Sequence, residues 1–426
     1  MTQQPPLITP DVLVVGGGPA GLTAAAELTA LGAGHVLVVD REETAGGIPR
    51  HSGHTGYGLR DLHRVLTGPA YARHLVRRAA AAGAEIRTRT MVTGWADEHT
   101  AEVTSPGGRY RIRPRAVVLA TGARERPRAA RRVPGDRPEG VYTTGQVQRL
   151  VHLHGRPVGT RAVIVGAEPV SWSAALTLRG AGCTPALMIS QYPRAESYGA
   201  FTAVGRTVLG VPVAVRSRVA RILGKGRCEA VEIEHLDTGR RRTFPCDTVV
   251  FTGDWLPDHE LARTAGLALD EGTRGPLTDS ALRTSRPGFF AAGNLLHPAD
   301  TADVAALDGR HVARRVMAHL HGAPQPAPGV RLIAEAPFRW VAPQLLRPGD
   351  PAPPRSRLLL WSDAYVRRPQ VHVQQDGRVL TRRTLPWPAS PGRVFRVPST
   401  VLADVSPAGG PVHIGLWEGP SSRGTS

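Results

Sequence analysis

The sequence has few cysteines, and their arrangement excludes several kinds of site. Its 426 residues include three, Cys183, Cys228 and Cys246, which are far apart and form neither a C-x-x-C motif nor a metal-ligand spacing. This usage predicts reduced, mostly buried thiols, a cytoplasmic setting and no metal site.

Long apolar runs are also missing. No stretch reaches the roughly 18 apolar residues that a membrane-spanning helix needs, so we expect no membrane span. Residues 1–6 contain no basic region followed by an apolar core, so we expect no secretory signal.

Lysine and aromatic residues are scarce although the chain is strongly basic. The net charge is +18, and Lys225 is the only lysine. The arginines are spread along the chain, with small groups at 124–132 and 240–242, and aromatics are only 5% of residues. A nucleic-acid interface would concentrate basic and stacking residues on one element, so we expect no nucleic acid partner. A compositional preference for arginine explains the charge best; attraction of an acidic protein or an anionic substrate is the alternative.

Near its start the chain carries a strand–turn–helix pattern. The apolar run Val12–Val15 is typical of a buried parallel strand, and Gly16, Gly18 and Gly21 follow as G-x-G-x-x-G before apolar residues at helical spacing. The first glycine permits a tight turn, the second lets the backbone approach a pyrophosphate, and the third lets helix and strand pack closely. The helix start then directs free N–H groups towards the phosphates.

A second apolar run, Val36–Val39, ends in Asp40, about 20 residues beyond the glycines. This is the position at which an acid hydrogen-bonds a ribose hydroxyl. The alternative is a glycine-rich turn without a ligand, but strand, glycines, helix, strand and acid in this order favour a dinucleotide site.

A related but altered pattern occurs in the middle of the chain, where we expect a second Rossmann-like unit over 158–258. After the strand Arg161–Val165, Glu168 stands in place of the middle glycine and Ser171 in place of the last. A carboxylate there would repel a pyrophosphate, although Arg194 lies where it could suit a 2′-phosphate. NAD(P) binding is therefore doubtful, and a structural or docking role is favoured.

After residue 321 the composition changes. Residues 322–355 are predicted to be a proline-rich linker, and residues 356–420 a small β-rich domain. Partner contact is the role we expect for this domain, and a stabilising cap is the alternative. Its predicted strands are 357–361, 370–374, 378–381, 394–397 and 412–416.

Four motifs together give a family resemblance: the Gly16–Gly21 turn, Asp40, Ala120-Thr-Gly122 and the stretch Thr284–Asn294. They resemble the pyridine nucleotide-disulphide oxidoreductase class of flavoproteins. The resemblance implies an α/β fold of two Rossmann-like dinucleotide-binding domains, the second inserted in the first, with FAD held by residues 8–125 and 276–321. The residues implied to bind FAD are Gly16, Gly18, Pro19, Ala20, Gly21, Asp40, Gly47, Ala120, Thr121, Gly122, Gly293, Asn294 and Thr301.

Two features of the last motif matter for the flavin. The class usually has Asp where this chain has Asn294, and an amide can still hydrogen-bond a ribityl hydroxyl. The following stretch, 301–320, predicts a long helix whose N-terminus the class aims at the flavin pyrimidine.

Within the class, the chain resembles flavoprotein subunits of opine oxidase, hydrogen cyanide synthase and dye-linked proline dehydrogenase, and the flavoprotein companion of anaerobic glycerol-3-phosphate dehydrogenase. The resemblance implies a small-molecule substrate and a partner that is a second flavoprotein, an iron–sulfur protein, or both. The stretches that carry it are 46–49, 54–59, 66–72, 122–127 and 134–145.

The residues available for catalysis differ from those of disulphide reductases. The loop 46–54, where some of those enzymes carry redox cysteines, has none, so disulphide reduction is excluded unless another chain supplies the thiols. His51, His54 and His63 are candidate acid–base groups, with His54 the best of them; bonds to the loop backbone or to phosphate are the alternative.

We therefore expect an FAD-dependent oxidoreductase subunit that acts on an amine, imino acid or hydroxy compound. The alternatives are a stand-alone NAD(P)H-dependent flavin reductase and a non-catalytic FAD-binding relay or docking subunit.

Overall fold

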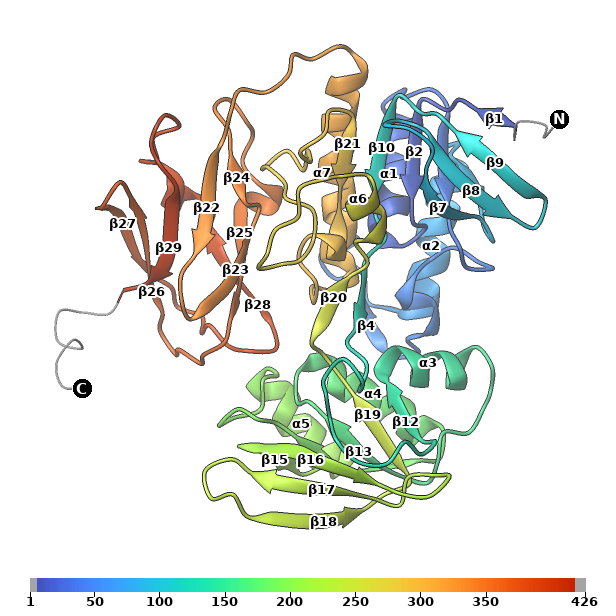
Figure 1. Ribbon diagram of the computed structural model, residues 1–426, viewed down its shortest axis with the longest axis vertical. Coiled ribbons are helices and arrows are strands. Elements are labelled where there is room, and N and C mark those ends of the chain that lie inside the picture. Colours follow the sequence, from blue (N-terminus) through green and yellow to red (C-terminus); the bar gives the residue numbers. More distant parts are fainter. Residues whose placement is uncertain (1–5, 418–426) are drawn as a thin grey trace.

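A computed structural model describes residues 6–417 of the chain, so the predictions on residues 1–5 and 418–420 lie outside the described part. The described chain forms three units, which Figure 1 separates clearly. The first two each contain a parallel sheet covered by helices, and the third is built of strands. The α/β class with two Rossmann-like units and a C-terminal β unit is confirmed.

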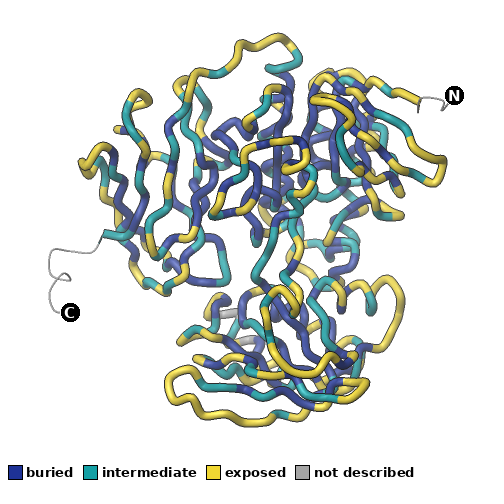
Figure 2. The backbone as a smooth tube through the Cα atoms, in the orientation of Figure 1, coloured by how far each residue is buried: buried dark blue, intermediate teal, exposed yellow. Residues whose placement is uncertain are grey.

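The first unit is built on a five-stranded parallel sheet in the order β21-β10-β2-β3-β6. Its strands are β21 (Phe289–Ala291), β10 (Ala116–Leu119), β2 (Val12–Val15), β3 (Val36–Val39) and β6 (Glu85–Arg87). β2, β3 and β10 are buried along their whole length, which explains their unbroken apolar sequences. Figure 2 shows this buried centre in dark blue.

The long helices of this unit are α1 (Pro19–Ala30), α2 (Gly68–Ala81) and α7 (Ala302–Leu320). Glycines bring α1 and α7 together, because a Cβ on Gly309 would lie 2.1 Å from the Ala20 carbonyl oxygen. A side sheet has the order β1-β9-β8-β7, from β1 (Leu7–Ile8), β9 (Gly108–Ile112), β8 (Ala101–Ser105) and β7 (Met91–Trp95). The smaller elements are η1 (Ile48–His51), β4 (Thr55–Tyr57), β5 (Leu66–Thr67), α6 (Glu260–Thr264) and η2 (Gly293–Leu295).

The second unit has a parallel sheet in the order β12-β19-β13-β14-β15, and it joins the first through the antiparallel pair β11–β20. The sheet strands are β12 (Val141–Thr143), β19 (Thr248–Phe251), β13 (Arg161–Val165), β14 (Thr184–Ile189) and β15 (Val213–Ala214). The other elements are β11 (Ala123–Glu125), β20 (Trp255–Pro257), α3 (Thr144–His152), α4 (Pro169–Gly180), α5 (Gly199–Leu209), and the meander β16 (Ser217–Leu223), β17 (Ala230–His235) and β18 (Arg241–Pro245).

The third unit packs two sheets over one apolar core, with orders β24-β22-β29-β26-β27 and β23-β25-β28. The strands are β22 (Val330–Ala334), β23 (Phe338–Ala342), β24 (Leu345–Leu346), β25 (Arg357–Ser362), β26 (Gln370–Gln375), β27 (Arg378–Thr384), β28 (Val394–Pro398) and β29 (Val412–Leu416). Two short turns, η3 (Pro354–Ser356) and η4 (Ser399–Leu402), complete it.

Two predicted boundaries were wrong. The segment 322–355 is not simply a linker, because β22, β23 and β24 lie within it and pair with strands further along the chain, so the unit begins near Val330 and not at 356. The amphipathic sequence of residues 71–82 predicts a helix there, but α2 begins at Gly68, since the Thr67 hydroxyl accepts a hydrogen bond from the Ala70 N–H and Pro69 fits the first turn.

Candidate functional site

The turn between β2 and α1 has the geometry that a diphosphate requires. Gly16 has a φ of +110°, and a Cβ there would lie 2.4 Å from the Ala120 carbonyl oxygen. A Cβ on Gly21 would lie 1.9 Å from the Gly16 carbonyl oxygen. These two glycines are therefore required by the packing of the chain itself.

Gly18 differs from its neighbours. Apart from adjacent residues, the nearest described atom to a Cβ on Gly18 would be the Gly47 Cα, at 3.9 Å. Gly18 is also the N-cap of α1, and no described side chain caps that end, so its first N–H groups are available. The open space beside Gly18 thus combines with an uncapped helix start, which is the arrangement that binds phosphates.

Asp40 lies at the end of β3, beside this turn. It is buried, with 8% of its surface exposed, and accepts hydrogen bonds from the Gly17 and Glu42 backbone N–H groups, both at 2.8 Å. Burial raises the pKa of Asp40, although both hydrogen bonds oppose the rise. The carboxylate is therefore held at the glycine turn with lone pairs left for another donor.

The residues after β21 form the facing wall. Gly293 has a φ of +74°, and a Cβ there would lie 2.8 Å from the Ala20 Cβ. The Asn294 amide nitrogen donates to the Asp300 carbonyl oxygen at 2.9 Å. The Asn294 Oδ1 is buried and has no hydrogen-bonding partner among residues 6–417. A buried acceptor without a donor fits a hydroxyl group of a bound ligand.

Thr301 is the N-cap of α7, as the sequence predicts, but its hydroxyl donates to the Asp303 carboxylate instead of capping the helix. Asp303 is buried in the first turn, and Arg60 lies 3.3 Å from it. The Asp303 carboxylate offsets the positive N-terminal end of α7, and the Arg60 guanidinium restores positive charge there. Sequence reasoning did not find this pair, because Arg60 and Asp303 are separated by 243 residues.

The predicted Ala120-Thr-Gly122 turn lies at the junction with the second unit. The Thr121 hydroxyl donates to the Asp258 carbonyl oxygen at 2.7 Å, and the Asp258 N–H donates to the Gly122 carbonyl oxygen at 2.9 Å. Gly122 has a φ of +76°. These bonds connect the end of β10 to the segment that returns from the second unit.

His54 is held by its own loop. Its Nε2 lies 2.9 Å from the Ser52 hydroxyl and its Nδ1 lies 2.7 Å from the Thr55 carbonyl oxygen. Its ring centroid is 5.5 Å from that of Tyr57. Because the carbonyl can only accept, this arrangement fixes the proton on Nδ1 and leaves Nε2 to accept from Ser52.

Of the other two candidate histidines, His51 is less suited to proton transfer. His51 is buried, and burial, with nearby Arg50 and Arg149, lowers its pKa to about 4, so it is neutral near pH 7. His63 adopts a φ of +53°.

A buried tyrosine–acid pair beneath this loop was not found from the sequence. The Tyr71 hydroxyl donates to the Asp61 carboxylate at 2.6 Å, and both residues are buried. Burial, then Asp61, raises the pKa of Tyr71; burial also raises that of Tyr57, where a hydrogen bond with Ser52 opposes the rise. Both tyrosines therefore stay protonated at neutral pH.

In the second unit, Glu168 fills the corresponding turn. Gly166 has a φ of +136°, and a Cβ there would lie 2.6 Å from a Glu168 carboxylate oxygen. Two further buried acids lie nearby. Burial and Glu168 raise the pKa of Glu196 to about 8, and burial raises that of Glu125 to about 7. Three carboxyl groups thus gather where a nucleotide would place its phosphates.

The cysteines are distant from the His54 loop in the sequence, and all three are buried and free. The fold brings Cys228 and Cys246 together, since a hydrogen bond from Cys246 is the main cause that lowers the pKa of Cys228. The sequence spacing gave no sign of this contact, which arises because Cys246 follows β18 and Cys228 precedes the neighbouring β17.

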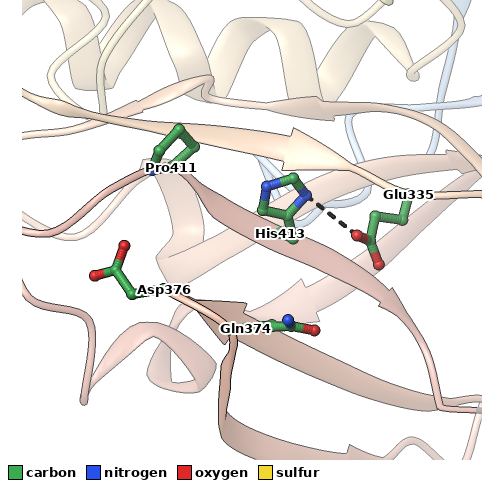
Figure 3. Close-up of a pocket in the computed structure, with 6 residues that line it drawn as sticks. Glu335, Gln374, Asp376, Pro411 and His413 are labelled. Atoms are coloured by element: carbon green, nitrogen blue, oxygen red, sulfur yellow. Dashed lines mark ion pairs between the residues drawn. The ribbon is translucent and has the colours of Figure 1, made fainter.

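A separate polar cavity of about 260 Å³ lies on the third unit. Figure 3 shows His413 and Glu335 paired beside it, with Gln374 and Asp376 on the neighbouring strand and turn. It contains none of the predicted site residues. Within residues 6–417, no helix is long and apolar enough to cross a membrane, and no group of three His, Cys, Asp or Glu side chains could hold a metal ion.

The two parallel units and the open glycine turn of the first define a two-dinucleotide-domain oxidoreductase. The chain belongs to the pyridine nucleotide-disulphide oxidoreductase family, whose family model matches residues 10–322. It is a flavoprotein oxidoreductase, and the family implies FAD as its cofactor.

Three similar proteins each align with about 70% of this chain. An opine oxidase subunit from Agrobacterium tumefaciens (strain Ach5) is 27% identical over 342 residues, covering 72% of this chain and 64% of that protein. The alpha subunit of sarcosine oxidase from Corynebacterium sp. (strain P-1) is 27% identical over 313 residues, covering 68% and 31%. The chain therefore spans less than two thirds of either relative. The crystal structure of T. acidophilum thioredoxin reductase matches with a TM-score of 0.61 and 23% identity, covering 72% and 97%.

Proposed function

We propose that the chain is the FAD-carrying subunit of a dehydrogenase or oxidase that acts on an amine, imino acid or hydroxy compound. The observation that carries the FAD site is the open cradle beside Gly18, with the buried acceptor of Asn294 on the facing wall. Both features leave room and hydrogen-bonding capacity that the described chain does not itself use.

In this proposal, the α1 N-terminus and the glycine backbone hold the pyrophosphate, and Asp40 accepts from a ribose hydroxyl. Asn294 accepts from the ribityl chain, and the uncapped start of α7, with Arg60, faces the pyrimidine. The remaining assigned contacts to the cofactor come from Pro19, Ala20, Gly21, Gly47, Ala120, Thr121, Gly122, Gly293 and Thr301, and Gly16 forms the turn.

FAD supplies the redox chemistry when bound, as acceptor of a hydride from substrate. The residues of the chain hold the cofactor in position and provide a path for the proton. His54 is the proposed acid–base residue, since its Nε2 faces the Ser52 hydroxyl at 2.9 Å and can take a proton that passes through that hydroxyl.

The proposal of a partner rests on two observations. The relatives are named as subunits of oxidases. The loop 46–54 carries no cysteine, so this loop supplies no dithiol to accept the electrons. Electrons would therefore leave to a second flavoprotein or an iron–sulfur protein.

The test is anaerobic reduction of the FAD-loaded chain. We expect an opine, sarcosine or a related secondary amine to bleach the flavin, either with the chain alone or together with the proteins that copurify with it. The His54→Gln variant should lower the reduction rate while retaining FAD. Bleaching by NADH or NADPH with no response to any amine, imino acid or hydroxy compound would instead favour a nucleotide-dependent flavin reductase.

A further inference from the structure

One short segment of the third unit, residues 389–398, contacts both dinucleotide units; it leads into and includes β28 (Figure 1). At one end of the segment, Gly392 packs against Glu168 and Glu196 of the second unit. At the other end, the Arg396 guanidinium lies 2.6 Å from the Asp300 carboxylate of the first unit. A single stretch of chain therefore contacts the second unit at its nucleotide-type turn and the first unit at Asp300, just before α7.

The contact at the second unit is tight. Gly392 has a φ of +77°, and a Cβ on it would lie 2.4 Å from the Glu196 Cβ and 2.9 Å from the Glu168 Cβ. Glu168 is the N-cap of α4, the residue at which a dinucleotide would place its pyrophosphate. The backbone of the third unit thus lies directly against the entrance of the second nucleotide site.

Cation–ring contacts surround this point on both sides. The Arg393 guanidinium carbon lies 4.6 Å from the centre of the Tyr198 ring, and that of Arg194 lies 5.0 Å from the centre of the Tyr365 ring. Arg194, the residue that could have met a 2′-phosphate, is therefore directed to the third unit. Each contact pairs a residue of the second unit with one of the third.

The other end of the segment is anchored in the first unit. Asp300 is buried, and its carboxylate accepts from the Thr301 N–H at 2.8 Å as well as from Arg396. The Asp300 carbonyl oxygen is the acceptor for Asn294. Because a buried carboxylate is costly without its cation, Arg396 fixes the segment firmly beside the start of α7 in the first unit.

We propose that residues 389–398 form a plug, anchored at Asp300, that closes the second dinucleotide site of this chain against NAD(P) and related nucleotides. The first site keeps its open cradle at Gly18, whereas the second is filled by Glu168 from within and covered by Gly392 from outside. The chain then handles one dinucleotide only. The third unit accordingly acts as a permanent cover of the second site.

Hydrogen exchange of the full chain, followed by mass spectrometry, tests the plug. Gly392→Ala should raise exchange about tenfold in peptides spanning 166–172, because the new Cβ must displace the segment from Glu168 and Glu196. Gly377→Ala is the matched control: its φ is +75°, so the backbone cost is the same, but a Cβ there meets no described atom within 4 Å. The control should leave the hydrogen exchange of residues 166–172 unchanged.

A second pair of variants tests the anchor. Arg396→Met should also raise hydrogen exchange at 166–172 in the second unit, because it releases the segment from Asp300 in the first unit. Arg383→Met should not, because Arg383 bonds Thr400 within the third unit. In the unaltered chain, saturating NADH or NADPH should leave exchange at 166–172 as it is without nucleotide. Protection of these residues by either nucleotide, or Gly392→Ala exchange equal to that of the unaltered chain, would overturn the plug.

Discussion

The glycines of the first turn have different roles, which a single substitution separates. Gly16 and Gly21 leave no room for a Cβ within the protein, whereas Gly18 has a φ of −85° and open space beside it. Gly18→Ala should therefore fold normally and bind FAD about tenfold more weakly or worse, because the methyl group enters the volume assigned to the pyrophosphate.

This prediction is checked by FAD titration of the apoprotein together with thermal unfolding. Gly180→Ala is the control, since a Cβ on Gly180 meets no described atom within 4 Å and the residue lies at the end of α4, in the second unit. If Gly18→Ala bound FAD as tightly as the control does, the assignment of the pyrophosphate to this turn would be wrong.

Glu196 makes stability depend on pH. Its pKa is raised to about 8 in the folded chain, chiefly by burial and then by Glu168, against an ordinary value of 4.5. Between these two values the folded state binds more protons than the unfolded state, so this residue lowers stability as pH rises from about 4.5 to about 8. Glu168, in the turn after β13, faces Glu196. Glu168 also interacts electrostatically with Arg131 and with Glu125.

Glu196→Gln should flatten this part of the pH profile and stabilise the chain by about 1–3 kcal/mol at pH 8, because a neutral amide replaces a buried carboxylate that has no ion-pair partner within residues 6–417. Denaturant unfolding at several pH values measures it. Glu260→Gln, at an exposed ion pair with Arg263, serves as control and should leave the slope unchanged. A slope that survives in Glu196→Gln would assign the titration to another group.

The sequence predicted the residues whose role depends on neighbours that are close to them in the chain. Gly16, Gly21 and Thr301 lie as the turn and helix patterns indicate. The Arg60–Asp303 pair could not be predicted, because it depends on a contact between segments far apart in the chain. Asn294 was predicted, but only the structure shows that its Oδ1 is buried without a donor among the described residues. His54 was visible as a candidate, but only the structure shows both ring nitrogens held by its own loop.

At the scale of elements, α7 is attached to the third unit by a buried ionic cluster. Asp308 of α7 is paired with His297 and with Arg355, which precedes β25. Burial opposes ionisation of Asp308, but Arg355 and then His297 outweigh it and lower its pKa. The Asp308 carboxylate is therefore charged in the folded chain, and its burial is tolerated because Arg355 is paired with it.

Arg355→Met should destabilise the chain by about 3–5 kcal/mol, because it leaves a buried carboxylate without its guanidinium. Arg339→Met removes an exposed ion pair with Asp363 and should change the free energy of unfolding by about 0.5 kcal/mol or less. Denaturant unfolding of the two variants compares them directly. Equal effects would mean that the cluster does not hold α7 to the third unit.

Helices and strands were predicted correctly where apolar residues form a clear pattern, and they were missed where a proline-rich composition hides that pattern. The strands β2, β3 and β13 and the helix α7 match their sequence patterns within a residue. In the segment taken as a linker, prolines before and after Val330–Ala334 hid a strand that pairs with β29, about 80 residues later. Such pairing is set by the fold and not by local propensity.

At the scale of the whole molecule, the family fold could be predicted because two repeated strand–turn–helix patterns mark its two dinucleotide units. The position of the third unit could not, because Gly392, Arg396 and Arg355 carry no local signal of the residues they contact. These contacts nevertheless distinguish the two nucleotide-type turns: one is open beside Gly18, and the other is covered.

The central claim is that the chain carries one dinucleotide cofactor, FAD, and receives no electrons from a nicotinamide nucleotide. The visible spectrum of the purified full chain, before and after anaerobic addition of NADH and of NADPH, tests it most directly. We predict flavin absorbance that stays oxidised with both nucleotides. A colourless protein that FAD cannot reconstitute, or a flavin that either nucleotide bleaches, would contradict the account.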